Sequence, residues 1–186
     1  RHLTYELTPY DETILLDTDY LVLDDSLLNL FATDFDYKLM HHNTNYAGAV
    51  YERMGETSLP HVWAPVILFR KTDKSQMLFD LVGKIHRNYR YYRSLYNIRE
   101  GNFRNDYAFA MANNIINGYC LNESQGIPWP MLTIEQDIGR AELHNIQIRV
   151  YHDDHAVVLP RQNIHVRDKE YLQSDNLREV VDASTV

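Results

Sequence analysis

The chain has 186 residues, of which 45% are hydrophobic and 24% are charged, and this size and composition predict one globular domain. Its net charge of −8 excludes a protein that coats nucleic acid with its whole surface, although a local basic patch stays open. The single cysteine excludes an internal disulfide, and no apolar run reaches the ~20 residues that span a bilayer, so we expect a cytoplasmic protein.

The first predicted elements flank a pair of carboxylates. Residues 13–16 form an apolar run typical of a buried parallel strand, and residues 20–23 predict a second short strand. Asp17 and Asp19 lie between these runs, where two carboxylates are costly unless something pairs with them. Mg²⁺ or Mn²⁺, together with oxygens of a substrate phosphate, is the usual partner of such a pair. The alternative is an acidic turn, in which Asp-x-Asp is common by chance.

The remaining elements mix strands with helices, which predicts the α/β class. The apolar strand over residues 62–69 contains Pro65, so we expect a bend or bulge there. Residues 105–117 predict a helix that ends at Gly118. The other expected elements are a short helix over 25–31, a strand over 36–41, a long loop over 42–60, a helix over 73–96, a turn-rich loop over 125–130, strands over 146–151, 156–159 and 163–166 with a polar turn at 152–155, and a final helix over 169–181.

Residues 9–22, which contain the two aspartates, resemble the DxD segment of nucleotide-sugar glycosyltransferases with the GT-A fold, closest to the family 8-like and bacteriophage-type members. Three later segments follow in that family's order: 62–70 resembles the strand after the metal site, 105–109 a helix start, and 163–169 the C-terminal histidine segment. The resemblance implies a GT-A-like mixed sheet flanked by helices. It also implies that residues 1–186 are a single domain, the C-terminal two-thirds of a GT-A-like domain whose nucleotide-binding portion would precede Arg1.

The same resemblance implies a metal centre and a donor site. Asp17, Asp19 and His165 would hold Mn²⁺ or Mg²⁺, and a nucleotide-diphosphate sugar would be the donor. Lys169 would neutralise charge on the departing phosphate. The alternatives are an ordinary strand histidine at position 165 and a solvated lysine at position 169.

Two further residues are expected to contact the substrates. Asp106 would be a catalytic polar group that contacts the sugar or the acceptor, and Trp63 would stack on a sugar ring or a base. Aspartate is also a favoured residue at helix N-termini, and a tryptophan is equally at home in a core.

The segment over residues 84–104 is basic with interleaved aromatic residues, which is unusual in an acidic chain. Basic groups among aromatics suit a nucleic-acid backbone and its bases, or a phosphorylated acceptor. The alternative is an amphipathic helix whose tyrosines pack while its arginines reach solvent. The basic residues are Lys84, Arg87, Arg90, Arg93, Arg99 and Arg104.

The sequence therefore leads us to expect a metal-dependent glycosyltransferase that moves a sugar, a hexosyl or pentosyl group, from a nucleotide-diphosphate donor to an acceptor hydroxyl. The phage-type resemblance suggests modified DNA as the acceptor and a host cytoplasm as the location. Two alternatives stay open: a non-catalytic GT-A-like binding module, and a metal-dependent nucleotidyltransferase, because paired carboxylates and a metal also serve phosphoryl transfer.

Overall fold

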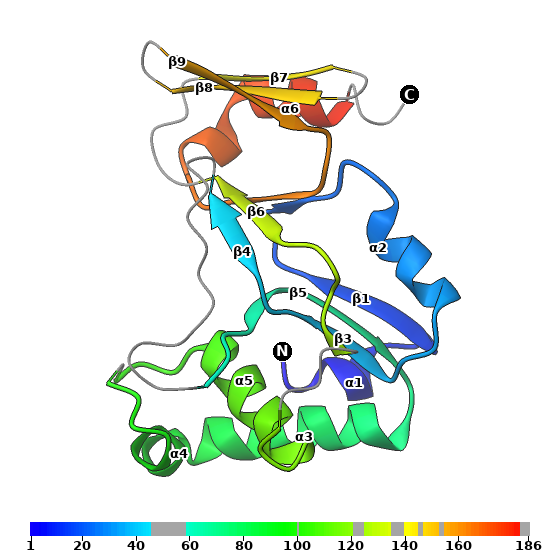
Figure 1. Ribbon diagram of the computed structural model, residues 1–186, viewed down its shortest axis with the longest axis vertical. Coiled ribbons are helices and arrows are strands. Elements are labelled where there is room, and N and C mark those ends of the chain that lie inside the picture. Colours follow the sequence, from blue (N-terminus) through cyan, green and yellow to red (C-terminus); the bar gives the residue numbers. More distant parts are fainter. Residues whose placement is uncertain are drawn as a thin grey trace. The chain divides into compact units, whose positions relative to one another are not determined.

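The computed structural model describes residues 1–45, 59–99, 101–120, 125–134, 140–144, 147–152 and 155–182 (Figure 1). Over these residues the chain is a mixed α/β protein with three small sheets and six α-helices, which confirms the predicted class. Its contacts divide it into two compact units, and the single domain expected over residues 1–186 stays a prediction. Unit 1 comprises Arg1–Leu16, Phe31–His42 and Tyr51–Pro130, and unit 2 comprises Asp17–Leu30, Asn43–Val50 and Met131–Val186.

The sheet of unit 1 is antiparallel throughout. Strand β5 (Trp63–Arg70) lies between β1 (Glu12–Leu16) and β3 (Tyr37–Met40). The expectation that residues 13–16 form a buried parallel strand is wrong in direction and in burial, because β1 pairs antiparallel with β5 at the half-buried edge of the sheet. The bulge predicted at Pro65 is confirmed, since the β3–β5 register shifts there and Met40 pairs with the first residue of β5.

The helices of unit 1 begin and end at recognisable signals. Helix α3 starts after Thr72, whose hydroxyl accepts a hydrogen bond from the Ser75 N–H at 3.2 Å. The single helix expected over 73–96 is wrong, because Asn88 leaves the helical region (φ −123°, ψ 31°) and a new helix starts after it. The predicted end of α5 is confirmed by the left-handed Gly118 (φ 61°). The helices are α1 (Thr4–Leu7), α3 (Asp73–Arg87), α4 (Tyr89–Leu95) and α5 (Asn105–Ile116).

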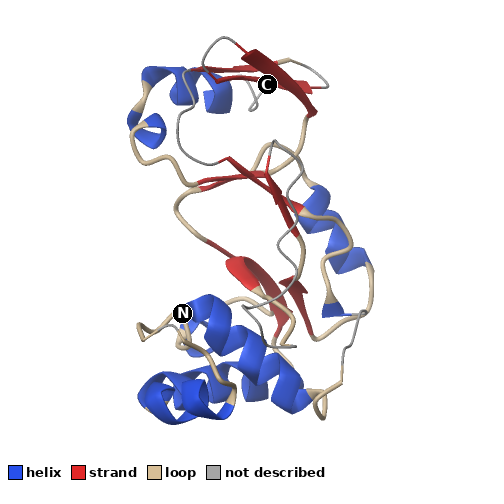
Figure 2. Ribbon diagram, turned by 60° about the vertical axis from the view of Figure 1, so that its left-hand side comes forward, coloured by secondary structure: helices blue, strands red, loops and turns tan. Residues whose placement is uncertain are grey.

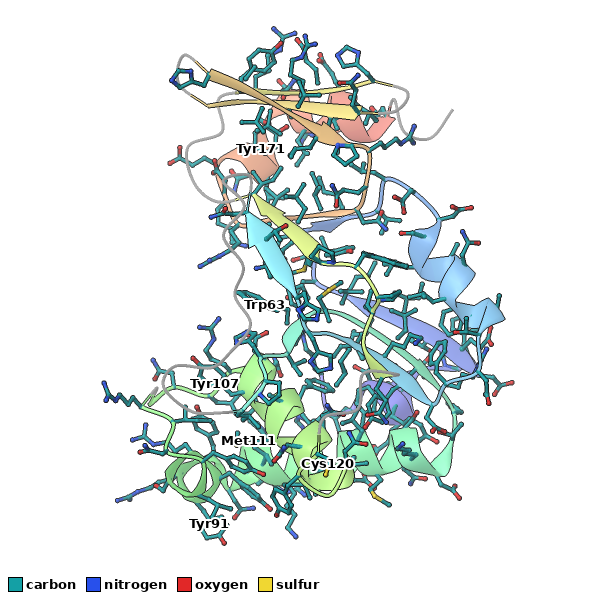
Figure 3. All side chains as sticks on the ribbon, viewed as in Figure 1. Trp63, Tyr91, Tyr107, Met111, Cys120 and Tyr171 are labelled. Atoms are coloured by element: carbon teal, nitrogen blue, oxygen red, sulfur yellow. The ribbon has the colours of Figure 1, made fainter. Side chains whose placement is uncertain are left out.

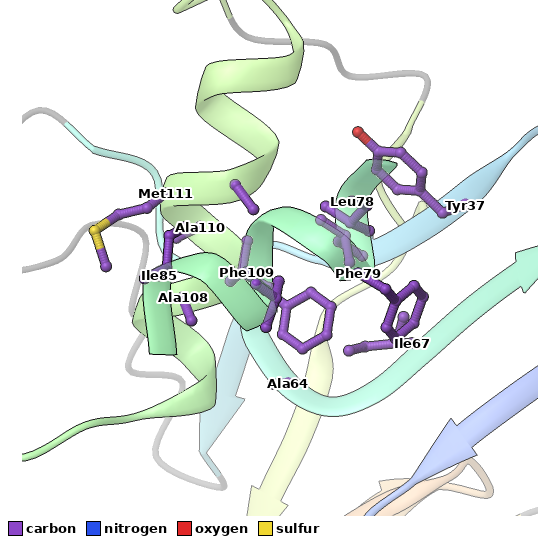
Figure 4. Packing of buried hydrophobic residues seen from close by; sticks show 14 of the residues in the cluster. Tyr37, Ala64, Ile67, Leu78, Phe79, Ile85, Ala108, Phe109, Ala110 and Met111 are labelled. Atoms are coloured by element: carbon purple, nitrogen blue, oxygen red, sulfur yellow. The ribbon is translucent and has the colours of Figure 1, made fainter. Parts of the chain in front are cut away.

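The core of unit 1 lies between β5 and the helices α3 and α5 (Figure 4). Phe79 is its centre, with its ring 4.7 Å from Phe69 and 5.6 Å edge-on to Phe109. Each fully buried phenylalanine contributes about 1.5–3 kcal/mol by removal of apolar surface from water. Tyr89 and Tyr92 of the basic segment also pack on this core, as the amphipathic alternative predicts.

Unit 2 contains a mixed four-stranded sheet in the order β2-β10-β6-β4. Strand β10 pairs antiparallel with β2 and parallel with β6, which pairs parallel with β4. The loop expected over 42–60 is wrong at its start, where the short strand β4 lies, and residues 46–58 are outside the described ranges. Strand β6 was not predicted. The four strands are β2 (Tyr20–Leu21), β4 (Asn43–Asn45), β6 (Met131–Ile134) and β10 (Ile164–Val166).

A second sheet of unit 2 is a three-stranded antiparallel meander with a helix against it (Figure 2). The expected final helix is divided into a 3-10 turn, Tyr171–Gln173, and a helix. Of the predicted polar turn, residues 153 and 154 lie outside the described ranges, and His152 pairs with His155. In the described part of the chain no helix is long and apolar enough to cross a membrane. The elements are β7 (Arg140–Leu143), β8 (Gln147–His152), β9 (His155–Pro160) and α6 (Asp175–Asp182), and the short helix α2 (Ser26–Asn29) completes the unit.

Candidate metal centre

Strand pairing in unit 2 brings Asp19 beside His165. His165 lies opposite Tyr20 in the β2–β10 pair, and the Val166 N–H donates to the Asp19 carbonyl at 2.8 Å. On the other side, the Tyr20 N–H closes a turn onto the Asp17 carbonyl at 3.1 Å. The backbone of Asp19 is therefore fixed by both a turn and a sheet.

The side chains of Asp19 and His165 face each other without a normal hydrogen bond. His165 Nε2 lies 3.5 Å from Asp19 Oδ1, and the two side chains are only 9% and 15% exposed. Among the described residues, Asp19 Oδ1 has no hydrogen-bond partner. The other oxygen, Oδ2, accepts a hydrogen bond from Lys169 Nζ at 2.6 Å, and Lys169 is otherwise well exposed. One buried carboxylate oxygen thus lacks the partner that such atoms normally have.

The pKa of Asp19 reflects two opposed effects. Burial raises this pKa, but the hydrogen bond from Lys169 and the electrostatic effects of the neighbouring His165 and Lys169 side chains outweigh burial, so the pKa lies below its ordinary value. Asp19 is therefore a carboxylate at neutral pH.

Two buried polar residues lie behind His165. The Thr133 hydroxyl of β6 donates to Asn43 Oδ1 of β4 at 2.7 Å, and the same hydroxyl oxygen lies 3.3 Å from His165 Nδ1. Sequence reasoning missed both residues. The signal for Thr133 was a polar residue inside the apolar run of Leu132 and Ile134, whereas nothing in the sequence near Asn43 indicated a strand.

The start of β10 is tied to the chain that follows β2 by Asn163. Its Oδ1 accepts from the Leu23 and Asp24 N–H groups at 2.7 and 3.1 Å, and its Nδ2 donates to Asp24 Oδ1 at 2.9 Å and to Ser26 Oγ at 3.1 Å. This buried amide therefore holds the start of β10, two residues before His165, next to the segment that follows β2.

The predicted metal ligands are brought together in part. Asp19 and His165 meet, but no group of three or more His, Cys, Asp or Glu side chains that could hold a metal ion occurs in the described ranges, so the full set with the half-buried Asp17 stays a prediction. A carboxylate oxygen and an imidazole nitrogen are a donor pair that suits Mn²⁺. The unpartnered Oδ1 therefore fits a cation beside these two residues.

Asp106, in unit 1, has a different environment. Its Oδ1 accepts a hydrogen bond from the Ala64 N–H at 2.9 Å, and its Oδ2 accepts one from Arg104 Nη2 at 3.2 Å. The Arg104 guanidinium also lies 5.4 Å over the Tyr107 ring. Asp106 thus joins the first turn of α5 to the start of β5, where a carboxylate also complements the helix dipole.

Trp63, labelled in Figure 3, packs against a buried histidine. The Trp63 ring lies 4.3 Å from the His61 ring, and the His61 carbonyl accepts from His41 Nδ1 at 3.1 Å. His61 Nε2 has no hydrogen-bond partner among the residues that the structure describes. Burial lowers the pKa of His61 to about 4, although the nearby Asp106 acts in the opposite direction. The ring is therefore neutral at pH 7, and sequence reasoning did not single it out.

The basic segment keeps most of its charges at the surface. Lys84, Arg87 and Arg90 are exposed, whereas Arg104 is paired with Asp106. Tyr91 points into solvent from α4 with 66% of its surface exposed (Figure 3). The segment therefore presents cations with one exposed aromatic ring.

No relative was found for this chain. No protein-family model matches it, and comparisons with curated proteins and with solved structures found no match. The likeness to GT-A glycosyltransferases therefore rests on the sequence motifs.

Unit 1 contains a pocket of about 590 Å³ that Asp106 does not line. It is formed by α1 and α3 and lined by side chains of both charges, among them Glu6, Asp80 and Arg87. Neither Trp63 nor Asp106 lines this pocket, so the pairing of donor groups, rather than pocket size, identifies the candidate centre.

Proposed function

We propose that the protein is a metal-dependent glycosyltransferase of the GT-A type, which moves a sugar from a nucleotide-diphosphate donor to an acceptor hydroxyl. The observation that carries the proposal is the Asp19–His165 pair, in which an unpartnered carboxylate oxygen lies 3.5 Å from a ring nitrogen. These are the two ligands, far apart in the sequence, that the family resemblance assigns to one metal ion.

The physical argument concerns the unpartnered oxygen. A buried acceptor without a hydrogen bond costs about 1–3 kcal/mol, which a bound divalent cation offsets. Asp19 and His165, with Asp17, would hold Mn²⁺ or Mg²⁺, and oxygens of the donor diphosphate would complete the coordination. When bound, such an ion acts as a Lewis acid on the leaving nucleoside diphosphate.

The chain's own cation near the pair is Lys169. Its ammonium is 2.6 Å from Asp19 Oδ2, and 70% of its side chain is exposed, so it can turn toward a phosphate without leaving a buried site. There it would neutralise charge on the departing group. The proposal does not use Asp106, because both of its oxygens already accept hydrogen bonds.

Calorimetric titration with UDP, with and without Mn²⁺, tests this function. We expect Mn²⁺-dependent binding that Asp19→Asn abolishes and Asp25→Asn preserves; the latter removes the same charge from an exposed aspartate of unit 2. If UDP, GDP, ADP, CDP and dTDP all fail to bind, the non-catalytic module is the better account. Release of pyrophosphate instead of nucleoside diphosphate would identify a nucleotidyltransferase.

We also propose a nucleic acid as the acceptor. In the described part of the chain, Lys84, Arg87, Arg90 and Arg93 form no ion pair with a carboxylate, and residues 81–99 contain no Asp or Glu. Arginine forks suit phosphates, and the exposed Tyr91 offers a ring on which a base can stack. The alternative of an anionic membrane is weaker, because only Tyr91 and Leu95 supply exposed large apolar surface on α4.

Fluorescence anisotropy with a labelled single-stranded oligonucleotide tests the acceptor. Arg87→Gln/Arg90→Gln should weaken binding and reduce the slope of log K against log salt by about 0.7 per lost phosphate contact. The control Arg140→Gln/Arg178→Gln removes the same charge from unit 2 and should leave binding unchanged. Binding to phosphatidylserine vesicles but not to the oligonucleotide would contradict the proposal.

A further inference from the structure

Asn43 and Thr133 meet behind His165 because three strands of unit 2 run parallel side by side. His165 of β10 is in register with Thr133 of β6, and Met131 of β6 with Asn43 of β4. Thr133 and Asn43 are each 1% exposed, so their polar atoms are shielded from water. The hydrogen bonds between the three side chains are therefore fixed by protein partners.

The direction of these hydrogen bonds follows from a count of protons. A threonine hydroxyl carries one proton, and the 2.7 Å contact assigns it to Asn43 Oδ1, which can only accept. At His165 Nδ1, 3.3 Å away, the hydroxyl oxygen can then only accept, so Nδ1 carries a proton. In the neutral imidazole the lone pair is consequently on Nε2, the atom that faces Asp19 Oδ1.

We propose that Asn43 and Thr133 are positioning residues, which hold His165 as its Nδ1-protonated tautomer and direct the Nε2 lone pair toward Asp19. As far as a bound cation is concerned, this inference rests on the proposed function. The Nε2 lone pair of His165 and Asp19 Oδ1 are then two acceptors 3.5 Å apart, which repel each other. A cation that both atoms bind would remove this repulsion. Histidine ligands of metals are commonly held in this manner through their second nitrogen.

The tautomer can be observed without any metal. In the full chain labelled with ¹⁵N-histidine, a long-range ¹H–¹⁵N spectrum at about pH 8 separates the two neutral tautomers. The chain has nine histidines, and loss of one set of signals in His165→Gln identifies His165. We expect the Nδ1–H form in the wild type and in Thr133→Ser, and a shift toward the Nε2–H form in Thr133→Val, which has nearly the same shape but no hydroxyl.

The same variants also test the role of Thr133 in Mn²⁺ binding. Titration with Mn²⁺, followed by the electron paramagnetic resonance signal of the free ion, should show about 10–100-fold weaker binding in Thr133→Val than in the wild type. Thr133→Ser should bind as the wild type does. The matched control is Thr13→Val, which removes a threonine hydroxyl hydrogen-bonded to Thr8 in unit 1 and should change neither the tautomer nor Mn²⁺ affinity.

The possible results separate this inference from the proposed function. An Nε2–H tautomer in the wild type, or a tautomer that Thr133→Val leaves unchanged, would overturn the positioning role even if Mn²⁺ binds. The expected tautomer shift in a protein that binds no Mn²⁺ would support the positioning role and remove the metal from the proposed function.

Discussion

Asp19 in unit 2 and Asp106 in unit 1 are equally buried but differently partnered. Each side chain is 15% exposed. Both oxygens of Asp106 accept hydrogen bonds, one from the Ala64 backbone and one from Arg104. Asp19 accepts one hydrogen bond from the exposed Lys169 and directs its other oxygen at a histidine ring. Burial alone therefore does not distinguish the two carboxylates.

The difference in hydrogen bonding indicates which of the two carboxylates can bind a ligand. A carboxylate with both oxygens satisfied stabilises the fold, and its removal leaves a backbone N–H without a partner. A carboxylate with an unpartnered oxygen contributes less to the fold and can bind a cation. The comparison predicts that substitutions at Asp106 act on stability, whereas those at Asp19 act on binding.

The largest expected effect is a difference in Mn²⁺ affinity between variants of Asp19 and variants of Asp106. Asp19→Asn should weaken Mn²⁺ binding by about a hundredfold or more, because the ion loses one of its few charged protein ligands. Asp106→Asn should leave the affinity within about twofold, since its oxygens serve Ala64 and Arg104. Calorimetry measures the Mn²⁺ affinity of both variants, and an equal loss of affinity in the two would contradict the different roles of Asp19 and Asp106.

The second prediction concerns the pH dependence of the Asp106 region. The pKa of His61 is about 4 in the folded chain and about 6.5 in the unfolded chain. Its contribution to the free energy of unfolding is therefore complete above pH 6.5 and is lost as the pH falls toward 4. The unfolding free energy should therefore fall by about 3 kcal/mol between pH 7 and pH 4 from this group. Urea unfolding followed by circular dichroism should show a smaller fall in His61→Phe.

The exposed His155 supplies the control for that measurement. His155→Phe should keep the pH dependence of the wild type. A His61→Phe protein with the full wild-type dependence would show that His61 is not the group responsible.

The third prediction compares stabilities directly. Asp106→Ala should lower the free energy of unfolding by about 1–3 kcal/mol, because it leaves the Ala64 N–H unpaired. Asp19→Ala should cost less than about 1 kcal/mol, since the one hydrogen bond that its carboxylate accepts comes from a lysine in solvent and its other oxygen accepts none. Urea titration at pH 7 measures both, and a larger loss at Asp19 would contradict the assignment of roles.

The smallest expected effect is at Lys169. Lys169→Met should change the unfolding free energy by less than about 0.5 kcal/mol, because 70% of the lysine side chain is exposed. It should nevertheless raise the pKa of Asp19, whose lowering depends on that hydrogen bond. Carbon-13 titration of the Asp19 carboxyl group measures the change, and an unaltered pKa would show that Lys169 does not hold the carboxylate in solution.

The sequence by itself determined the elements that depend on near neighbours. The apolar run of β5 and its bulge at Pro65, the end of α5 at Gly118, and the strands β8, β9 and β10 follow from periodicity and turn chemistry. Each of these signals is contained within a few consecutive residues. The break at Asn88 escaped prediction because apolar positions with helical spacing continue on both sides of it.

Only the tertiary structure decided which strands pair and which polar atoms have partners. Strand β4 reads Asn-Thr-Asn, has no apolar pattern, and exists because β6 supplies its hydrogen bonds. The same pairing places Thr133 between Asn43 and His165, and a β5 backbone N–H satisfies Asp106. These contacts join residues far apart in the chain. Their energy depends on strand order and register, which local sequence does not encode.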